Sequence, residues 1–129
     1  MTHEETSDTG SPLRVARSQS DYATVLAPIG EIDISTIGLL NVELAAATST
    51  PERALVVDLE GVSFMDSTGL RTLVEAASGA AQRAQAFAVF RVPPAVKRVL
   101  QITKLETHFH EVPDLEPATL TAIRSAANT

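Results

Sequence analysis

The segment Ala54–Leu59 constrains the fold of this 129-residue chain more than any other part of it. It is apolar except for Asp58, and its middle is β-branched. A strand with one face in water alternates polar and apolar residues. A short unbroken apolar run is instead typical of a strand that other elements cover on both faces. We therefore predict a central strand here.

Extended and helical segments alternate along the rest of the chain. Extended segments are predicted at 13–15 and 22–29, as an outer strand or hairpin, and at 86–92 and 109–112. Apolar residues at helical spacing predict four helices, from residue 33 to the break at 49–51, over 66–84, around 96–100 and around 120–127. Short connections between these elements favour an α/β fold, a mixed sheet of about four to five strands packed against about four helices.

Chain length favours a single domain, which we place at residues 13–129. Residues 1–12 are polar and acidic, have no apolar period and end at Pro12, so we expect a flexible acidic lead-in there. The sequence has no cysteine, which excludes disulfides, thiolate nucleophiles and cysteine zinc sites. With neither a signal peptide nor an apolar run long enough for a bilayer, the expected location is cytoplasmic.

The charge balance excludes several classes of partner. Ten Lys and Arg stand against 16 Asp and Glu, for a net charge of -6. Nucleic acids and anionic membranes are recognised through clustered basic residues, so we expect neither nucleic-acid binding nor membrane insertion. Aromatic residues make up 4% of the chain, too few for a base-stacking platform. A basic protein partner is compatible with this charge.

Common catalytic motifs are missing from the sequence. It contains no GxGxxG, GxxxxGK[ST], GxSxG or HExxH spacing, so we expect no cofactor and no metal. His108 and His110 would share one face of a strand, but two ligands are too few for a metal site. We favour surface positions for both histidines, around a core anchor at Phe109.

The most informative segment is 64–70, FMDSTGL, which places two hydroxyl groups at the start of a predicted helix. Ser67 or Thr68 could be the N-cap, worth about 1 kcal/mol. Asp66 can cap equally well, which would leave the Ser67 hydroxyl free to face outward. Gly69 costs a helix about 1 kcal/mol relative to Ala, which suggests a bare surface for close approach of another molecule. The residues alone leave both roles open.

Three groups of residues occur in a characteristic order: Gly30–Asp33 (GEID), Val56–Leu59 with Val62–Leu70, and Pro94–Leu100 (PAVKRVL). Together they resemble the STAS domain family, and within it the bacterial anti-sigma factor antagonists. The resemblance runs from about Leu13 to the C-terminus and implies a STAS fold. The chain departs from the family's pattern at Arg71, a position that is often Gly, and at the turns containing residues 84–85 and 103–105.

The resemblance implies a regulatory binding protein rather than an enzyme. It implies that Ser67, with Thr68 as second acceptor, is phosphorylated by an anti-sigma factor that has serine kinase activity. The unmodified protein would bind that kinase and free a sigma factor, phosphorylation would end the binding, and a serine phosphatase would reset the cycle. The implied contact residues are Glu31, Asp33, Asp66, Ser67, Thr68, Gly69, Leu70 and Arg71.

Several charged residues have structural alternatives. Asp33 can cap the first predicted helix, contact a partner, or do both, and Glu31 can be a solvated loop charge. For Asp58 we expect a carboxylate satisfied by nearby backbone amides. Lys97 and Arg98 are expected on a solvated helix face rather than in an anion site.

Two other functions compete with the phosphorylation switch. One is a scaffold STAS subunit of a sensory or transport-associated complex, in which Ser67 is only a helix cap. The other is a small hydrolase that uses Ser67 with His108 or His110. The hydrolase requires an imidazole close to the start of the helix that Ser67 opens.

Overall fold

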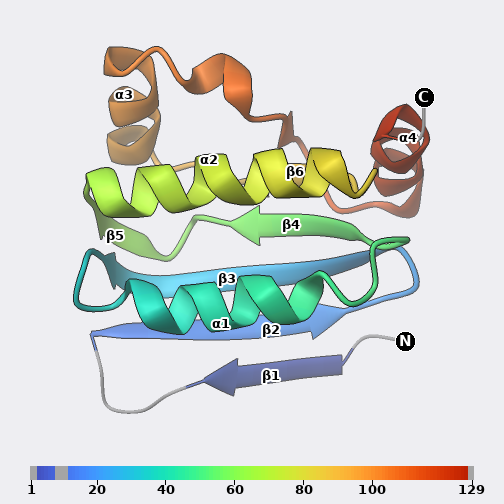
Figure 1. The fold of residues 1–129 in the computed structure, drawn as a ribbon, viewed down its shortest axis with the longest axis horizontal. Coiled ribbons are helices and arrows are strands. Elements are labelled where there is room, and N and C mark those ends of the chain that lie inside the picture. Colours follow the sequence, from blue (N-terminus) through green and yellow to red (C-terminus); the bar gives the residue numbers. More distant parts are fainter. Residues whose placement is uncertain (1–2, 8–11, 128–129) are drawn as a thin grey trace.

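In the computed structural model, which describes residues 3–7 and 12–127, a seven-stranded sheet is packed between helices. The strand order is β1-β2-β3-β4-β6-β7, and β5 pairs with β3 (Figure 1). The strands are β1 (His3–Ser7), β2 (Leu13–Gln19), β3 (Ala23–Ile32), β4 (Ala54–Asp58), β5 (Val62–Met65), β6 (Phe87–Phe90) and β7 (Glu111–Val112). The helices are α1 (Ile37–Ala47), α2 (Ser67–Gln82), α3 (Pro94–Ile102) and α4 (Pro117–Ala127), with a 3-10 turn, η1, at Glu106–His108.

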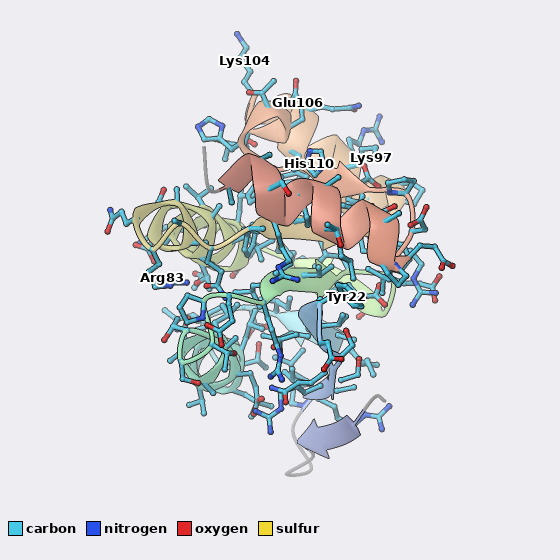
Figure 2. All side chains as sticks on the ribbon, turned by 90° about the vertical axis from the view of Figure 1, so that its right-hand side faces the viewer. Tyr22, Arg83, Lys97, Lys104, Glu106 and His110 are labelled. Atoms are coloured by element: carbon cyan, nitrogen blue, oxygen red, sulfur yellow. The ribbon has the colours of Figure 1, made fainter. Side chains whose placement is uncertain are left out.

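The central strand β4 is buried along its whole length, as its sequence predicts. Leu55 and Val57 point into the larger apolar cluster, beneath α1, α2 and α3. Val56 points the other way, into a smaller cluster with Ala88 and Leu120 of α4. Figure 2, a view along the strands, shows α1 and α2 together on one side of the sheet. The predicted α/β class is therefore confirmed, with helices on both faces.

The sheet is mixed because its two halves are connected differently. The strands β1, β2 and β3 are antiparallel neighbours. The pairs β3–β4, β4–β6 and β6–β7 are parallel, and helices lie in their connections. No helix within the described residues is long and apolar enough to cross a membrane.

Two strands, β5 and β1, were not expected from the sequence. The first half of β3 pairs with β4, through Ala23–Leu26, and its second half pairs with β5, so the long strand needs a second partner. The expected lead-in contains β1, which pairs with the outer edge of β2. An added edge strand is held by backbone hydrogen bonds, so it leaves no apolar period in the sequence. The remaining positions of the lead-in, 1–2 and 8–11, lie outside the described residues.

Gly30 has a backbone conformation and a close backbone neighbour that both exclude a side chain, and this generates a stability prediction. Its φ is +121°, and a Cβ there would lie 2.0 Å from the carbonyl oxygen of Pro12. Backbone atoms cannot give way as a side chain can, so Gly30→Ala should lower the free energy of unfolding by at least about 2 kcal/mol in urea denaturation.

The matched control is Gly38→Ala in α1, where nothing lies within 4 Å of the added Cβ. Removing a helical glycine should stabilise the protein by about 0.5 to 1 kcal/mol. Equal effects of the two substitutions would contradict the backbone contact at Gly30.

Candidate partner-binding site

Two neighbouring strands end side by side and lead into the segments that carry the predicted site residues. The strands β3 and β5 run parallel, with Ile32 paired to Met65. Just beyond them, the N–H of Asp66 donates to the carbonyl oxygen of Ile32 at 3.2 Å. The loop that begins at Asp33 and the start of α2 therefore lie together at one edge of the sheet (Figure 1).

Asp66 is the N-cap of α2, one of the two alternatives that the sequence left open. Its Oδ1 accepts hydrogen bonds from the backbone N–H groups of Thr68, at 2.9 Å, and Gly69, at 3.2 Å. Ser67 is exposed, and within the described part of the chain its hydroxyl makes no hydrogen bond. Because the aspartate satisfies the helix start, the serine hydroxyl is not needed there and faces solvent.

The expectation for Gly69 was wrong. Gly69 is buried, and a Cβ on it would lie 2.7 Å from both Ile32 Cγ2 and Met65 Cγ. The missing side chain thus allows the first turn of α2 to pack on the ends of β3 and β5, and it does not clear a path for another molecule. Leu70 is also in the core, with 6% of its surface exposed. Both residues therefore pack inside the protein.

Asp33 does not cap α1, because that helix begins four positions later, at Ile37, with Thr36 as its N-cap. Instead the Asp33 carboxylate closes a turn. Its Oδ1 accepts from the backbone N–H of Ser35 at 2.9 Å and from the Ser35 hydroxyl at 2.6 Å. The side-chain hydrogen bond from Ser35 is the largest cause that lowers the pKa of Asp33 below its usual value. The carboxylate therefore stays ionised at this edge.

The remaining predicted contact residues are on the surface. Glu31 and Arg71 are exposed, whereas Asp33, Asp66 and Thr68 are half-buried. The structure thus brings Glu31 and the two aspartates to the same sheet edge as Ser67.

Two apolar residues at this edge were missed. Ile34 is 81% exposed and Phe64 is 50% exposed. Phe64 pairs across β3–β5 with Glu31, and Ile34 directly follows Asp33. The polar residues on either side of Ile34, Asp33 and Ser35, were the available signal of its exposure. We call the exposed and half-buried set Glu31, Asp33, Ile34, Phe64, Asp66, Ser67, Thr68 and Arg71 the serine surface.

The hydrolase alternative is not supported. Phe109 is buried, as predicted, and His108 and His110 are exposed. Both histidines line a hollow beside Ala77 and the residues that follow it on α2. Ala77 is ten positions after Ser67, about 15 Å along a helix. Within the described residues no group of three or more His, Cys, Asp or Glu could bind a metal ion.

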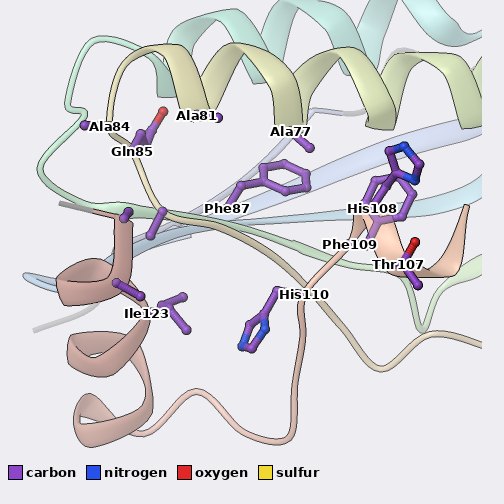
Figure 3. A pocket seen from close by; sticks show the side chains of 13 residues that line it. Ala77, Ala81, Ala84, Gln85, Phe87, Thr107, His108, Phe109, His110 and Ile123 are labelled. Atoms are coloured by element: carbon purple, nitrogen blue, oxygen red, sulfur yellow. The ribbon is translucent and has the colours of Figure 1, made fainter. Parts of the chain in front are cut away.

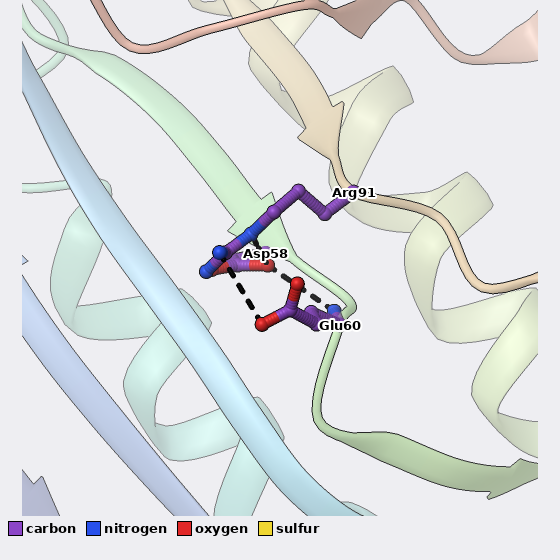
Figure 4. Close-up of polar contacts among 3 residues, drawn as sticks. All are labelled: Asp58, Glu60 and Arg91. Carbon is purple, nitrogen blue, oxygen red and sulfur yellow. Dashed lines mark hydrogen bonds and ion pairs between the residues drawn. The ribbon is translucent and has the colours of Figure 1, made fainter.

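Asp58 has a structural role, with more partners than the sequence suggested (Figure 4). Its Oδ1 accepts from the backbone N–H of Glu60 at 3.1 Å and from Arg91 Nε at 3.2 Å. Arg91 also pairs with the Glu60 carboxylate at 3.2 Å and lies over the Phe90 ring, 4.9 Å from its centroid. The cluster ties the ends of β4 and β6 together.

The expectation of a solvated face for the basic residues of α3 agrees with the structure. Lys97 and Arg98 are exposed, and Lys97 Nζ lies 3.3 Å from Glu111 Oε1.

Comparisons with known proteins agree on one family. Residues 14–118 match the STAS domain. The anti-sigma-B factor antagonist of Staphylococcus aureus is 32% identical over 81 residues, which cover 63% of this chain and 75% of that protein. The crystal structure of an anti-sigma factor antagonist from Mycobacterium paratuberculosis is 28% identical, with a TM-score of 0.68, and covers 96% of this chain and 95% of its own. The Bacillus protein SpoIIAA in its phosphorylated form shares the fold, with a TM-score of 0.61 at 17% identity over 78% of this chain and 92% of that one.

The division of roles between Asp66 and Ser67 can be tested by stability measurements. Asp66→Ala removes the acceptor of two backbone N–H groups and should lower the free energy of unfolding by about 1 kcal/mol. Ser67→Ala removes an exposed hydroxyl without a partner in the described residues, and its effect should stay within about 0.5 kcal/mol. Urea denaturation followed by circular dichroism gives both values. A loss for Ser67→Ala as large as that for Asp66→Ala would show that the serine is part of the cap.

Proposed function

The chain belongs to the STAS domain family and, within it, to the anti-sigma factor antagonists, and on this premise we propose a switch at Ser67. In its unmodified form the protein binds an anti-sigma factor with serine kinase activity through the serine surface, so that a sigma factor is released. Phosphorylation of Ser67 ends the binding, and a serine phosphatase restores it. One observation carries this proposal: the Ser67 hydroxyl is exposed and is not used by the helix that it opens.

The chemistry needs nothing from this chain except an accessible hydroxyl. Ser67 Oγ attacks the γ-phosphorus of ATP in the kinase, the bond from that phosphorus to the bridging oxygen of ADP breaks, and the serine proton passes to a base on the kinase. The protein is thus a substrate and regulator rather than an enzyme. SpoIIAA, which shares the fold, is known in a phosphorylated form. We place the cycle in the cytoplasm, where sigma factors act.

The added charge is large enough to end binding. A phosphoserine carries about -1.5 to -2 charges, and it would lie between Asp66 and the anionic nucleotide of the kinase that formed it. Two unit charges about 6 Å apart, at an effective dielectric of about 20, interact by roughly 2.8 kcal/mol, which is about a hundredfold in affinity. The N-terminus of α2 stabilises the phosphate by about 0.3 to 1 kcal/mol, so the free protein stays folded.

The binding energy has a separate source in this proposal. Ile34 and Phe64 are large apolar side chains that face solvent, Ile34 in the turn after β3 and Phe64 on β5, three positions before Ser67. Fully burying such a side chain contributes about 1.5 to 3 kcal/mol. They would anchor the complex, while the phosphorylation state of Ser67 would determine whether the complex dissociates.

Phosphorylation is tested by mixing the purified protein with ATP and the anti-sigma kinases of its own organism. Mass spectrometry should find one phosphate on Ser67, no phosphate on the Ser67→Ala variant and an unchanged site in Thr68→Ala.

Ser67→Asp should bind the kinase at least about tenfold more weakly in calorimetry, because it adds a negative charge to the interface. Equal binding by Ser67→Asp would contradict the switch. A stable large assembly, insensitive to Ser67→Ala in size-exclusion chromatography, would favour the scaffold alternative instead.

The apolar anchors are tested by a matched pair of substitutions. Ile34→Asp should weaken kinase binding at least about tenfold, since it removes an apolar contact and adds a desolvated charge. Val42→Asp is the control, because Val42 is also apolar and 64% exposed but lies on α1, outside the serine surface. Both variants should keep a melting temperature close to that of the parent. If Val42→Asp weakened binding as much as Ile34→Asp, the interface would lie elsewhere.

A further inference from the structure

A second concave site lies beside the end of α2 that is remote from Ser67. A cavity of about 540 Å³ opens between the C-terminal half of α2, the start of β6, residues 107–110 and α4 (Figure 3). Six of its 13 lining residues are alanines, among them Ala77 and Ala81. The elements are spaced by the sheet, and such short side chains cannot fill the gap between them. Phe87 and Ile123 provide its larger apolar walls.

A smaller, charged cavity lies next to this one. Ala84 and Ala86 line both, and the second cavity, of about 220 Å³, is also lined by Arg83 and Arg124. Among the described residues, Glu52 is the one acidic residue that lines it, so the two arginines leave a local excess of positive charge. That excess is notable on a chain whose net charge is -6. We call the two neighbouring cavities, which share Ala84 and Ala86, the alanine groove.

Arg83 is held in place by a buried side chain. Gln85 is 2% exposed, and its Oε1 accepts from Arg83 Nε at 3.2 Å and from Nη2 at 2.7 Å. The other end of the amide is anchored, because Nε2 donates to the carbonyl oxygens of Ala47, at 3.3 Å, and Arg53, at 3.2 Å. A buried glutamine with both ends bonded fixes the guanidinium, whose Nη1 makes no hydrogen bond within the described residues. The cation is therefore positioned before any ligand arrives.

We propose that the alanine groove binds a free medium-chain fatty acid. The carboxylate would lie at Arg83 and Arg124, since guanidinium groups match the planar carboxylate. The hydrocarbon tail would lie along Ala77, Phe87 and Ile123, where it removes apolar surface from water. The cavity volume lies within the range of small-molecule sites, about 300 to 1,000 Å³, which also combine apolar walls with a few polar groups. A monomeric acid fits better than a membrane surface, because the chain as a whole is acidic.

The site is independent of the proposed switch. Its α2 residues begin at Ala77, about 15 Å along the helix from Ser67. Occupation of the groove would leave the serine surface open, so the two proposals stand or fall separately.

Calorimetry with the full chain tests the proposal, with sodium decanoate, kept below its micelle concentration, as the probe. We expect saturable binding at one site per chain, at least tenfold weaker binding of decanol, which lacks the charge, and none of acetate, which lacks the tail. Arg124→Gln should weaken decanoate binding at least tenfold and leave decanol binding unchanged. Ala81→Leu, which fills the groove, should abolish both.

The control is Ala46→Leu, an exposed alanine on α1 outside the groove, which should bind decanoate as the parent does. Melting temperatures show whether each variant is folded. If Ala81→Leu does not fold, Arg124→Gln still tests the proposal. Absence of decanoate binding would overturn the proposal, and so would decanol binding as tight as that of decanoate. Co-sedimentation with phosphatidylglycerol vesicles without saturable decanoate binding would overturn it in favour of a membrane surface.

Discussion

The close packing of Gly69 against Ile32 and Met65 determines how this protein presents its serine. A side chain at Gly69 would overlap both neighbours at 2.7 Å, so only glycine lets α2 begin directly on the ends of β3 and β5. Asp66 can then do two things at once. Its backbone N–H bonds to the carbonyl of Ile32, and its carboxylate caps the helix. This arrangement does not need the Ser67 hydroxyl, and the exposure of the serine follows from the contacts that its neighbours make.

The sequence predicted the parts of the fold that depend on local or periodic signals. The buried strand β4 and the four helices could be stated from residue types and spacing. The cap of α2 stayed open until the structure showed that the Asp66 carboxylate accepts from two backbone N–H groups. Predictions failed where a tertiary contact decides. The sequence cannot distinguish a glycine that faces solvent from one that faces the core. Only the register of β3 against β5 places Gly69 inside. Asp33 is a good cap in isolation, but its hydrogen bonds with Ser35 close a turn that delays α1.

The sequence analysis missed two residues at this edge of the sheet for a related reason. Ile34 and Phe64 belong to segments whose neighbours are buried or charged, and periodicity assigns apolar side chains to the core by default. Their exposure follows from geometry at the end of the sheet, where β5 pairs with β3 but α1 has not yet begun. If the proposed function is correct, this surface combines anchors and a phosphorylation site without any motif to mark the anchors.

In the proposed switch, the residues that anchor the partner are separate from the residue that is phosphorylated, and this would limit what phosphorylation can do to the complex. Apolar burial at Ile34 and Phe64 in the proposed complex would not depend on the state of Ser67, so its contribution would persist after modification. A charge repulsion of roughly 2.8 kcal/mol would reduce the binding free energy that apolar burial provides, but would not remove all of it. Dissociation then requires that the unmodified complex be only moderately stable, with an affinity that a hundredfold loss moves across the cellular concentration of the partners. A much larger apolar interface would bind more tightly and could no longer be released by a single phosphate.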